Sequence, residues 1–147
     1  MKLSSKTRYG MLAMLDLALN YGAGPIRVGK IGSRQQLPVK YLEQLLALLC
    51  TSGLVRGIRG AGGGHTLAKP PSEISLREIY DVLEGSEGFV HCTTDAQGCD
   101  RYEFCVIQEV WTQMFEACMD VLGSTTLEEL AHRSQQKRSE AAGVYYI

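Results

Sequence analysis

The sequence predicts a mainly α-helical fold with a small β-hairpin wing: a winged helix-turn-helix domain followed by a long dimerisation helix. Three features support this fold class. Two short helical patterns meet at a tight turn around 37–38, a hairpin pattern with five small central residues spans 54–69, and apolar residues recur every three or four positions across 104–122. With 147 residues, the chain is long enough for one domain and an appendage.

The first helix is expected to begin at Ser4 or Ser5, because either hydroxyl can cap the free N–H groups of the first turn. Glycines and a proline at 22–25 end this helix, and a short extended segment follows at 26–28. Its core-facing side is predicted to consist of Met11, Leu12, Leu15, Ala18 and Leu19.

A helix-turn-helix is predicted from a brief helix near 30–36 and a second helix from Val39 to about Ser52. Pro38 suits the entry to the second helix, where its missing N–H costs nothing, and Gly53 suits the position just after the helix ends. The core-facing stripe of this helix is predicted to be Val39, Leu42, Leu45, Leu46 and Leu49. The opposite, solvent-facing side carries Lys40, Tyr41 and Gln44.

The hairpin is predicted to form the wing, with strands at 54–59 and 65–69 and a glycine-rich loop at 60–64. Glycine-rich loops also hold nucleotide phosphates, but those sites need a helix directly after the glycines, and the following HTLAKPP cannot begin one. A loop of small residues instead lets the backbone approach DNA closely. Arg56 and Arg59 flank this loop, where a guanidinium can reach into a DNA groove.

Charge divides the chain into two halves, although the overall net charge is only −1. Residues 1–69 hold ten Lys and Arg against two Asp and Glu, a net charge of +8. Residues 70–147 hold five against fourteen, a net charge of −9. Surfaces can be patchy without a function, but a positive excess confined to one half favours a polyanionic partner such as double-stranded DNA.

The acidic half begins after two consecutive prolines at 70–71. A capping box, SLRE at 75–78, opens a helix that runs to about Glu84, and TLEE at 126–129 opens a last helix in the same way. The inward residues of the first of these helices are expected to be Leu76, Ile79, Tyr80 and Leu83.

A long helix is predicted from about Phe104 to Leu122. Its apolar seam steps by four and three residues in turn, which is coiled-coil spacing. One helix of the same chain could cover the seam, but few helices are left to do so, and a homodimer is the favoured interpretation. The seam consists of Ile107, Trp111, Met114, Cys118 and Val121.

These elements divide the chain into four parts: a DNA-binding domain at 1–84, a cysteine-containing loop at 85–105, the dimerisation and C-terminal helices at 106–140, and a loosely ordered tail without an assigned role at 141–147. No apolar run approaches the ~20 residues that span a bilayer, and the N-terminus does not resemble a signal peptide. We therefore expect a cytoplasmic protein without membrane contact, whose five cysteines stay reduced.

Three cysteines, Cys92, Cys99 and Cys105, fall within fourteen residues of polar loop. Their spacing is too wide for a zinc ribbon, no C-x-x-C redox pair is present, and no histidine is posed against a thiol for catalysis. Three soft thiolates suit an iron–sulfur cluster, which tolerates varied spacing. The alternative is that these thiols bind no metal. Cys50 and Cys118 are interpreted as small packing residues.

The segments MKLSSKTRYG, PVKYLEQLLALLCTSGLV and VRGIRGAGGGHTLAKP resemble a family of bacterial winged-helix regulators. This family includes the iron–sulfur cluster regulator, the nitric-oxide-sensing repressor and the cysteine-metabolism repressor. The resemblance covers residues 1 to about 122. It implies that Tyr41, Glu43, Gln44 and Arg59 contact DNA, and Lys40 and Arg56 beside them complete the predicted DNA-binding set. Lys40 and Pro38 depart from the small polar residues common in the family, which predicts a preferred DNA sequence different from that of its members.

The three loop cysteines resemble the cluster-binding branch of the family, which implies a dimer with a 2Fe-2S cluster in preference to a 4Fe-4S cluster. The fourth ligand stays open. Gln108 stands where the iron–sulfur cluster regulator has a histidine, Glu109 and His91 are further candidates, and the partner chain or an exogenous ligand could serve. In the nitric-oxide sensor a partner residue at the position of Arg8 ligates, which arginine cannot do.

The predicted function is a dimeric, sequence-specific regulator of transcription, acting as a repressor on promoter DNA and sensing iron–sulfur status, redox state or nitric oxide through the cluster. One alternative is a clusterless repressor of the same family that is controlled by a small molecule or a protein partner. The other is a thiol-dependent redox enzyme.

Overall fold

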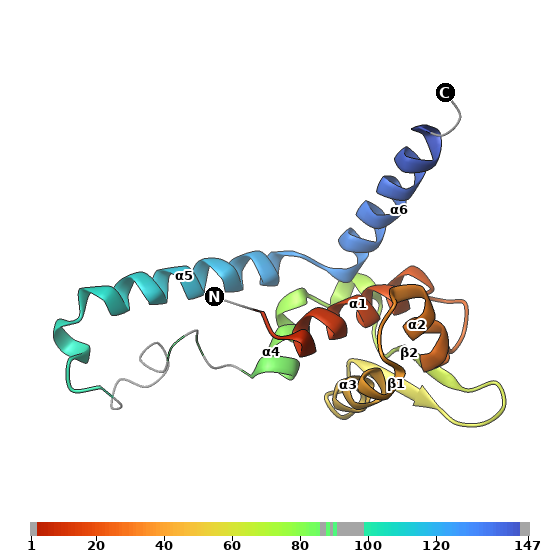
Figure 1. The fold of residues 1–147 in the computed structure, drawn as a ribbon, viewed down its shortest axis with the longest axis horizontal. Helices are drawn as coiled ribbons and strands as arrows, with labels where there is room; N and C mark the ends of the chain where they lie inside the picture. Colours follow the sequence, from red (N-terminus) through yellow and green to blue (C-terminus); the bar gives the residue numbers. More distant parts are fainter. Residues whose placement is uncertain (1–2, 86–87, 89, 91–98, 145–147) are drawn as a thin grey trace.

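The computed structural model describes residues 3–85, 88, 90 and 99–144 (Figure 1). The described residues form six α-helices, one two-stranded antiparallel sheet and two short 3₁₀ helices, which confirms the predicted fold class. The elements are α1 (Ser5–Leu19), α2 (Val28–Gln35), α3 (Val39–Thr51), β1 (Val55–Ile58), β2 (Gly64–Leu67), η1 (Pro71–Glu73), α4 (Leu76–Glu84), η4 (Tyr102–Phe104), α5 (Val106–Ser124) and α6 (Leu127–Val144).

Helix α1 lies at the centre of the winged domain, and its buried face differs from the predicted one. The side chain of Ser4 accepts a hydrogen bond from Thr7 N and caps the helix. Met11, Leu15 and Leu19 are only partly buried, and Leu12 is 38% exposed. The helix is apolar on nearly every side, so its sequence period does not single out one face. The buried positions are Thr7, Gly10, Ala13, Met14, Asp16, Leu17 and Ala18.

The helix-turn-helix forms from α2 and α3, as predicted. Gln36 ends α2 in the left-handed conformation, with φ 55°, and Gly53 follows α3 with φ 81°. The predicted stripe of α3 is buried at Leu42, Leu45, Leu46 and Leu49, whereas Val39 is 40% exposed. Val39 is the first residue of α3, so it lies at the edge of the core.

The wing is a hairpin in which Val55 pairs with Leu67 and Ile58 pairs with Gly64. A third backbone segment joins it, because Ile26 and His65 exchange two N–H to carbonyl hydrogen bonds of 2.8 Å each. An added Cβ on Gly64 would lie 2.5 Å from the carbonyl carbon and oxygen of Ile26. The glycine therefore permits this close pairing between the wing and the segment before α2.

Helix α4 begins at the predicted capping box, in which Ser75 and Glu78 bond reciprocally. It buries Ile79, Tyr80 and Leu83. The chain returns to this point after α5, since Leu76 N donates to Thr125 O at 2.9 Å. Leu127 N likewise donates to Ile74 O at 3.0 Å, which fixes the start of α6 on the winged domain.

Helix α5 extends away from the winged domain (Figure 1). Its buried residue is Met119, near the C-terminal end, and the predicted seam is largely exposed at Ile107 (54%) and Val121 (64%). Helix α6 also projects outward and continues through Val144, so residues 141–144 are helical where a loose tail was expected, and 145–147 lie outside the described residues. No helix in the described part of the chain is long and apolar enough to cross a membrane.

Candidate nucleic-acid interface and cysteine segment

The solvent-facing side of α3 carries most of the predicted DNA contacts. Lys40, Glu43 and Gln44 are exposed on this helix. Tyr41 is half-buried, because its ring packs edge-on against Tyr9 of α1, with 5.9 Å between ring centroids and 78° between planes. The phenol is therefore held in one position beside the three exposed polar residues.

The orientation of α2 is set by a buried carboxylate that sequence reasoning missed. Asp16 of α1 is 2% exposed and accepts hydrogen bonds from Arg34 Nη2 at 2.6 Å, Arg34 Nε at 3.0 Å and Gln35 Nε2 at 3.1 Å. The hydrogen bond to Asp16 raises the pKa of Arg34. The sequence did contain one signal for this pair: Asp16 is a charged residue within an apolar helix, and a buried charge needs a partner. This pair fixes α2 against α1.

The wing brings Arg56 and Arg59 to the surface beside the glycine loop, and both are exposed. A third arginine, Arg27, connects the loop to the start of α2, because its guanidinium donates to the Ala61 carbonyl oxygen. An added Cβ on Gly63 would lie 2.2 Å from Ile58 O, so a side chain there would collide with the hairpin backbone. The loop is therefore held in a defined shape by backbone packing and by one arginine.

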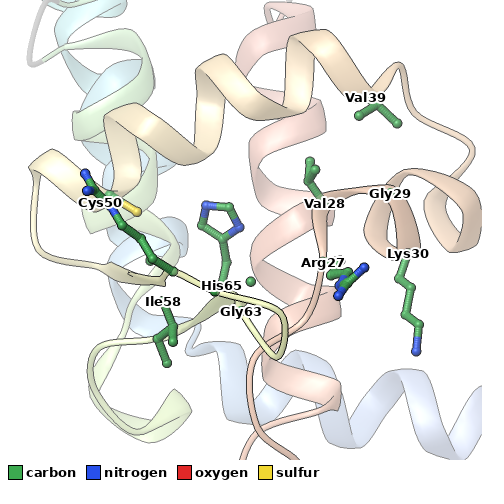
Figure 2. A pocket seen from close by; sticks show the side chains of 13 residues that line it. Arg27, Val28, Gly29, Lys30, Val39, Cys50, Ile58, Gly63 and His65 are labelled. Carbon is green, nitrogen blue, oxygen red and sulfur yellow. The ribbon is translucent and has the colours of Figure 1, made fainter.

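An open groove of about 1040 Å³ lies between the start of α2, helix α3 and the wing. Figure 2 shows His65 between Cys50 on one side and Arg27 and Val28 on the other. The Nδ1 atom of His65 is buried and has no hydrogen-bond partner in the described part of the chain. Burial lowers the pKa of His65, so the neutral imidazole is the favoured form.

Cys50 lies at the same groove, near the end of α3, and is half-buried. Its Sγ is 3.9 Å from the position of a Cβ added to Gly57. Burial raises the pKa of the Cys50 thiol, and a hydrogen bond with the Gly57 backbone partly offsets this. A protonated thiol is a poor nucleophile and a poor metal ligand, so this environment suits a packing cysteine.

The cysteine segment is described from residue 99 onward. Cys99 and Cys105 are free, half-buried thiols on either side of η4, and Cys105 is the residue just before α5. Tyr102 N donates to Cys99 O at 3.1 Å, and Cys105 N donates to Tyr102 O at 3.4 Å. Two consecutive turns therefore connect the two thiols. Cys92 and His91 lie outside the described residues.

The donor atoms that are described fit an iron–sulfur cluster in kind, because free thiols provide the soft ligands that such clusters prefer. Of the fourth-ligand candidates, Glu109 is exposed, and the Gln108 amide donates to Thr112 Oγ1 at 2.8 Å. Within 3–85, 88, 90 and 99–144, no three His, Cys, Asp or Glu side chains group so that they could hold a metal ion. A complete cluster site would need a ligand from outside these residues.

Comparison with known proteins gives consistent similarities. Residues 3–133 match the Rrf2 family, described as an iron-dependent transcriptional regulator. The chain is 39% identical over 147 residues to the HTH-type transcriptional regulator CymR of Bacillus subtilis, covering all of both chains. It is 36% identical over 135 residues to the HTH-type transcriptional regulator IscR of Escherichia coli, covering 92% of this chain and 83% of that protein.

Solved structures give the same two relatives. The structure of CymR, the global cysteine regulator of B. subtilis, superposes with a TM-score of 0.76 at 38% identity, covering 90% of this chain and 98% of that one. The structure of T. potens IscR superposes with a TM-score of 0.78 at 38% identity, covering 93% and 90%.

Proposed function

Because this chain belongs to the Rrf2 family of DNA-binding transcription regulators, we propose that it is a dimeric, sequence-specific repressor whose cysteine segment holds an iron–sulfur cluster. The relatives are named as regulators of transcription, so the chain is a regulator and the alternative of a thiol redox enzyme is wrong. The observation that supports the specific proposal is the occurrence of Cys99 and Cys105, as free thiols, directly before the outward-projecting α5.

Contact with DNA is assigned to one continuous surface made by α3 and the wing. Lys40, Glu43 and Gln44 face solvent on α3, where amide and carboxylate groups can bond base edges in a major groove. Tyr41 is positioned against α1 beside them. Arg56 and Arg59 on the wing are exposed, so their guanidinium groups can bind phosphates or enter a minor groove.

The test of DNA binding uses a duplex selected from a randomised library by the wild-type protein. The affinity should fall steeply as salt rises, because neutralised phosphates release counterions. Gln44→Ala should reduce the preference for the selected duplex over a random one by about 1–3 kcal/mol, with little change on random DNA. An affinity that does not depend on salt, or equal losses of affinity on both duplexes, would contradict the assignment.

Dimerisation is proposed through the seam of α5. Ile107, Trp111, Met114 and Val121 are 36–64% exposed in the single chain, which is unusual for large apolar side chains on one helix. A second copy of α5 offers the matching apolar stripe. A two-fold dimer would also place two copies of α3 for two half-sites of an operator.

The cluster is proposed to be held by Cys92, Cys99 and Cys105, with 2Fe-2S favoured over 4Fe-4S. Such a cluster would supply a centre that reacts to iron supply, oxidants or nitric oxide. Hydrogen bonds between the end of α4 and the start of α1 connect the cysteine segment to the DNA-binding half. Glu84, at the end of α4, accepts hydrogen bonds from Ser4 and from Thr7 Oγ1 (2.5 Å), which connects the departure point of the segment to the start of α1.

The cluster test measures visible absorbance of protein purified without oxygen. Ala substitution of Cys92, Cys99 or Cys105 should each abolish the chromophore, whereas Cys50→Ala and Cys118→Ala should retain it. The far-ultraviolet circular dichroism of all five variants should remain helical. If Cys50→Ala bleaches the protein as fully as Cys99→Ala, the division of the cysteines is wrong.

A clusterless repressor controlled by a small molecule or a protein partner is the second candidate. It is favoured by the similarity to B. subtilis CymR, which covers the full length of both chains. A colourless wild-type protein that binds DNA with salt dependence would select this candidate. If the wild-type protein is coloured, the variants Gln108→Ala, Glu109→Ala and His91→Ala identify the fourth ligand. Only the variant that lacks the true ligand should lose the chromophore or hold a labile cluster.

A further inference from the structure

We propose that the buried carboxylate of Asp16 in α1 is a positioning group for sequence recognition: acting through α2, it sets the placement of the base-reading face of α3. This inference rests on the proposed DNA-binding function and deepens it. Asp16 itself cannot touch DNA, because it is 2% exposed and lies inside the winged domain. Its effect is therefore expected on the discrimination between DNA sequences and not on the attraction to DNA in general.

The side-chain bonds between α1 and α2 have a fixed geometry. Arg34 donates from Nε at 3.0 Å and from Nη2 at 2.6 Å, each to a different oxygen of Asp16, and Gln35 donates from Nε2 at 3.1 Å. A bidentate arginine–carboxylate pair fixes both the distance and the angle between its partners, because both groups are planar. The pair therefore defines the orientation of α2 on α1 more closely than apolar contacts, which have no direction.

These bonds act on the turn of α2 that contacts the beginning of α3. Arg34 and Gln35 are the last two residues of α2. One turn earlier, the carbonyl oxygen of Gly32 accepts a hydrogen bond from Leu37 N at 2.9 Å. A Cβ added to Gly32 would lie 3.0 Å from both Leu37 O and Val39 Cγ2. Helix α2 is therefore in close contact with the start of α3, and a displacement of one helix moves the other.

Such a displacement would reach the residues assigned to base contacts. Val39 is the first residue of α3, and the exposed Glu43 and Gln44 follow within two turns. A hydrogen bond to a base edge weakens steeply when its distance or angle changes. Phosphate contacts from long, flexible Lys and Arg side chains tolerate the same shift. Loss of the Asp16 bonds should therefore reduce discrimination while binding to any DNA sequence persists.

Asp16→Asn tests this role, because it removes the carboxylate and keeps the size of the side chain. The amide N–H group would face the donors of Arg34, so the bidentate pair cannot form. Arg34 is 42% exposed and stays hydrated, so the variant leaves no buried charge without a partner.

The measurement compares affinity for the selected duplex with affinity for a random duplex of equal length. It is made at a temperature at which circular dichroism shows each variant to be folded. In Asp16→Asn the ratio of the two affinities should fall by about three- to thirty-fold. The affinity for the random duplex should change by less than about two-fold.

Leu127→Ala is the control that separates positioning from stability. Leu127 is completely buried, and its truncation leaves a cavity where α6 joins the winged domain beside Ile74. This variant should lose at least as much melting temperature as Asp16→Asn and should keep the wild-type ratio of affinities. A ratio that falls equally in both variants would reveal a general effect of stability and would overturn the proposal.

Gln44→Ala shows whether Asp16 acts through α3. In a protein that already carries Gln44→Ala, Asp16→Asn should lower the ratio by a smaller factor than in the wild type, because the base contact that it positions is absent. Independent losses, in which the two factors multiply, would contradict the proposed action through α3.

Gln35→Ala is a second variant that keeps the test decisive if Asp16→Asn does not fold. It removes a single bond to the carboxylate from a half-buried position, and it should lower the ratio in the same direction by a smaller factor. If the wild type prefers the selected duplex and Gln35→Ala and any folded Asp16→Asn keep that preference, the positioning role is overturned and the proposed function stands. If the wild type has no preference, sequence-specific recognition is wrong and both fall.

Discussion

The winged domain and α5 use their apolar residues in opposite ways. In the winged domain, Leu42, Leu46 and Ile79 are completely buried, and the main hydrophobic cluster includes Leu127 and Ala131 from the described residues after 84. Around the start of α5, Phe104, which precedes the helix, is 86% exposed, and Val106, the first helical residue, is 69% exposed. The first region packs its apolar side chains within the described chain, whereas the second leaves apolar surface exposed for the dimer interface proposed above.

Two alanine substitutions, one in each region, test this contrast and have the largest expected effect. Leu46→Ala should lower the free energy of unfolding by about 2–5 kcal/mol, because it removes a fully buried side chain and leaves a cavity. Ile107→Ala should instead change stability only through association. Urea unfolding at two protein concentrations separates these effects, since only a loss in an interface depends on concentration. A concentration-independent loss at Ile107 would contradict the contrast.

Trp111→Asp should break the interface of α5 without unfolding the winged domain. A charge placed in an apolar interface is costly, so light scattering should report a monomer. Binding to a duplex with two half-sites should weaken, whereas binding to a single half-site should persist. Gln113→Asp adds the same charge to an exposed position of α5 and should remain dimeric. A dimeric Trp111→Asp protein would place the interface elsewhere.

His65→Phe should remove part of the pH dependence of the stability of the winged domain. The pKa of His65 is lowered by burial, so the unfolded chain binds the proton first and stability falls as pH drops below about 6.5. The phenylalanine variant should lose this part of the decline in melting temperature between pH 7 and pH 5. His132→Phe, on the exposed side of α6, should keep the wild-type profile.

Glu84→Gln should have the smallest effect, at the boundary of the two regions. Hydrogen bonds from Ser4 and Thr7 lower the pKa of Glu84. The charged carboxylate therefore stabilises the fold fully at pH values above the ordinary pKa of glutamate. It is lost as pH falls through the lowered pKa. The melting temperatures of wild type and variant should therefore differ at pH 6, and the difference should shrink as the pH falls below about 4.3 and through the lowered pKa. Glu116→Gln, exposed on α5, is the control and should match the wild type throughout.

Helix caps, helix ends and the hairpin were predictable from the sequence. The cap at Ser4, the capping box at Ser75, the stop at Gly53 and the hairpin all occur where the residue types require them. Each depends on residues a few positions apart, so a single sequence contains the information.

Contacts between distant residues were not predictable in this way. The prediction for α1 was only partly right: Ala18 is buried and Met11, Leu15 and Leu19 pack at the edge of the core, whereas Leu12 is exposed although it is as apolar as the residues that pack inward. The hydrogen bonds that Arg34 donates to Asp16 and that Arg27 donates to the Ala61 carbonyl join different elements, and the sequence period does not reveal them. Likewise, the predicted DNA contacts follow from exposed positions on α3, but the groove beside them follows only from how α2 meets the wing.

Within the described part of the chain, α5 is attached to the winged domain at its C-terminal end, and this makes the helix a lever. Met119 and the backbone bonds around Thr125 and Leu127 hold its C-terminal end, and Cys105 is at the other end. Nineteen residues at about 1.5 Å each give an arm of about 28 Å, so a tilt of about 10° at the fixed end moves the far end by about 5 Å. By the same ratio, an ångström-scale displacement beside the thiols turns into a rotation of only about two degrees where α5 meets Tyr80 and Arg77.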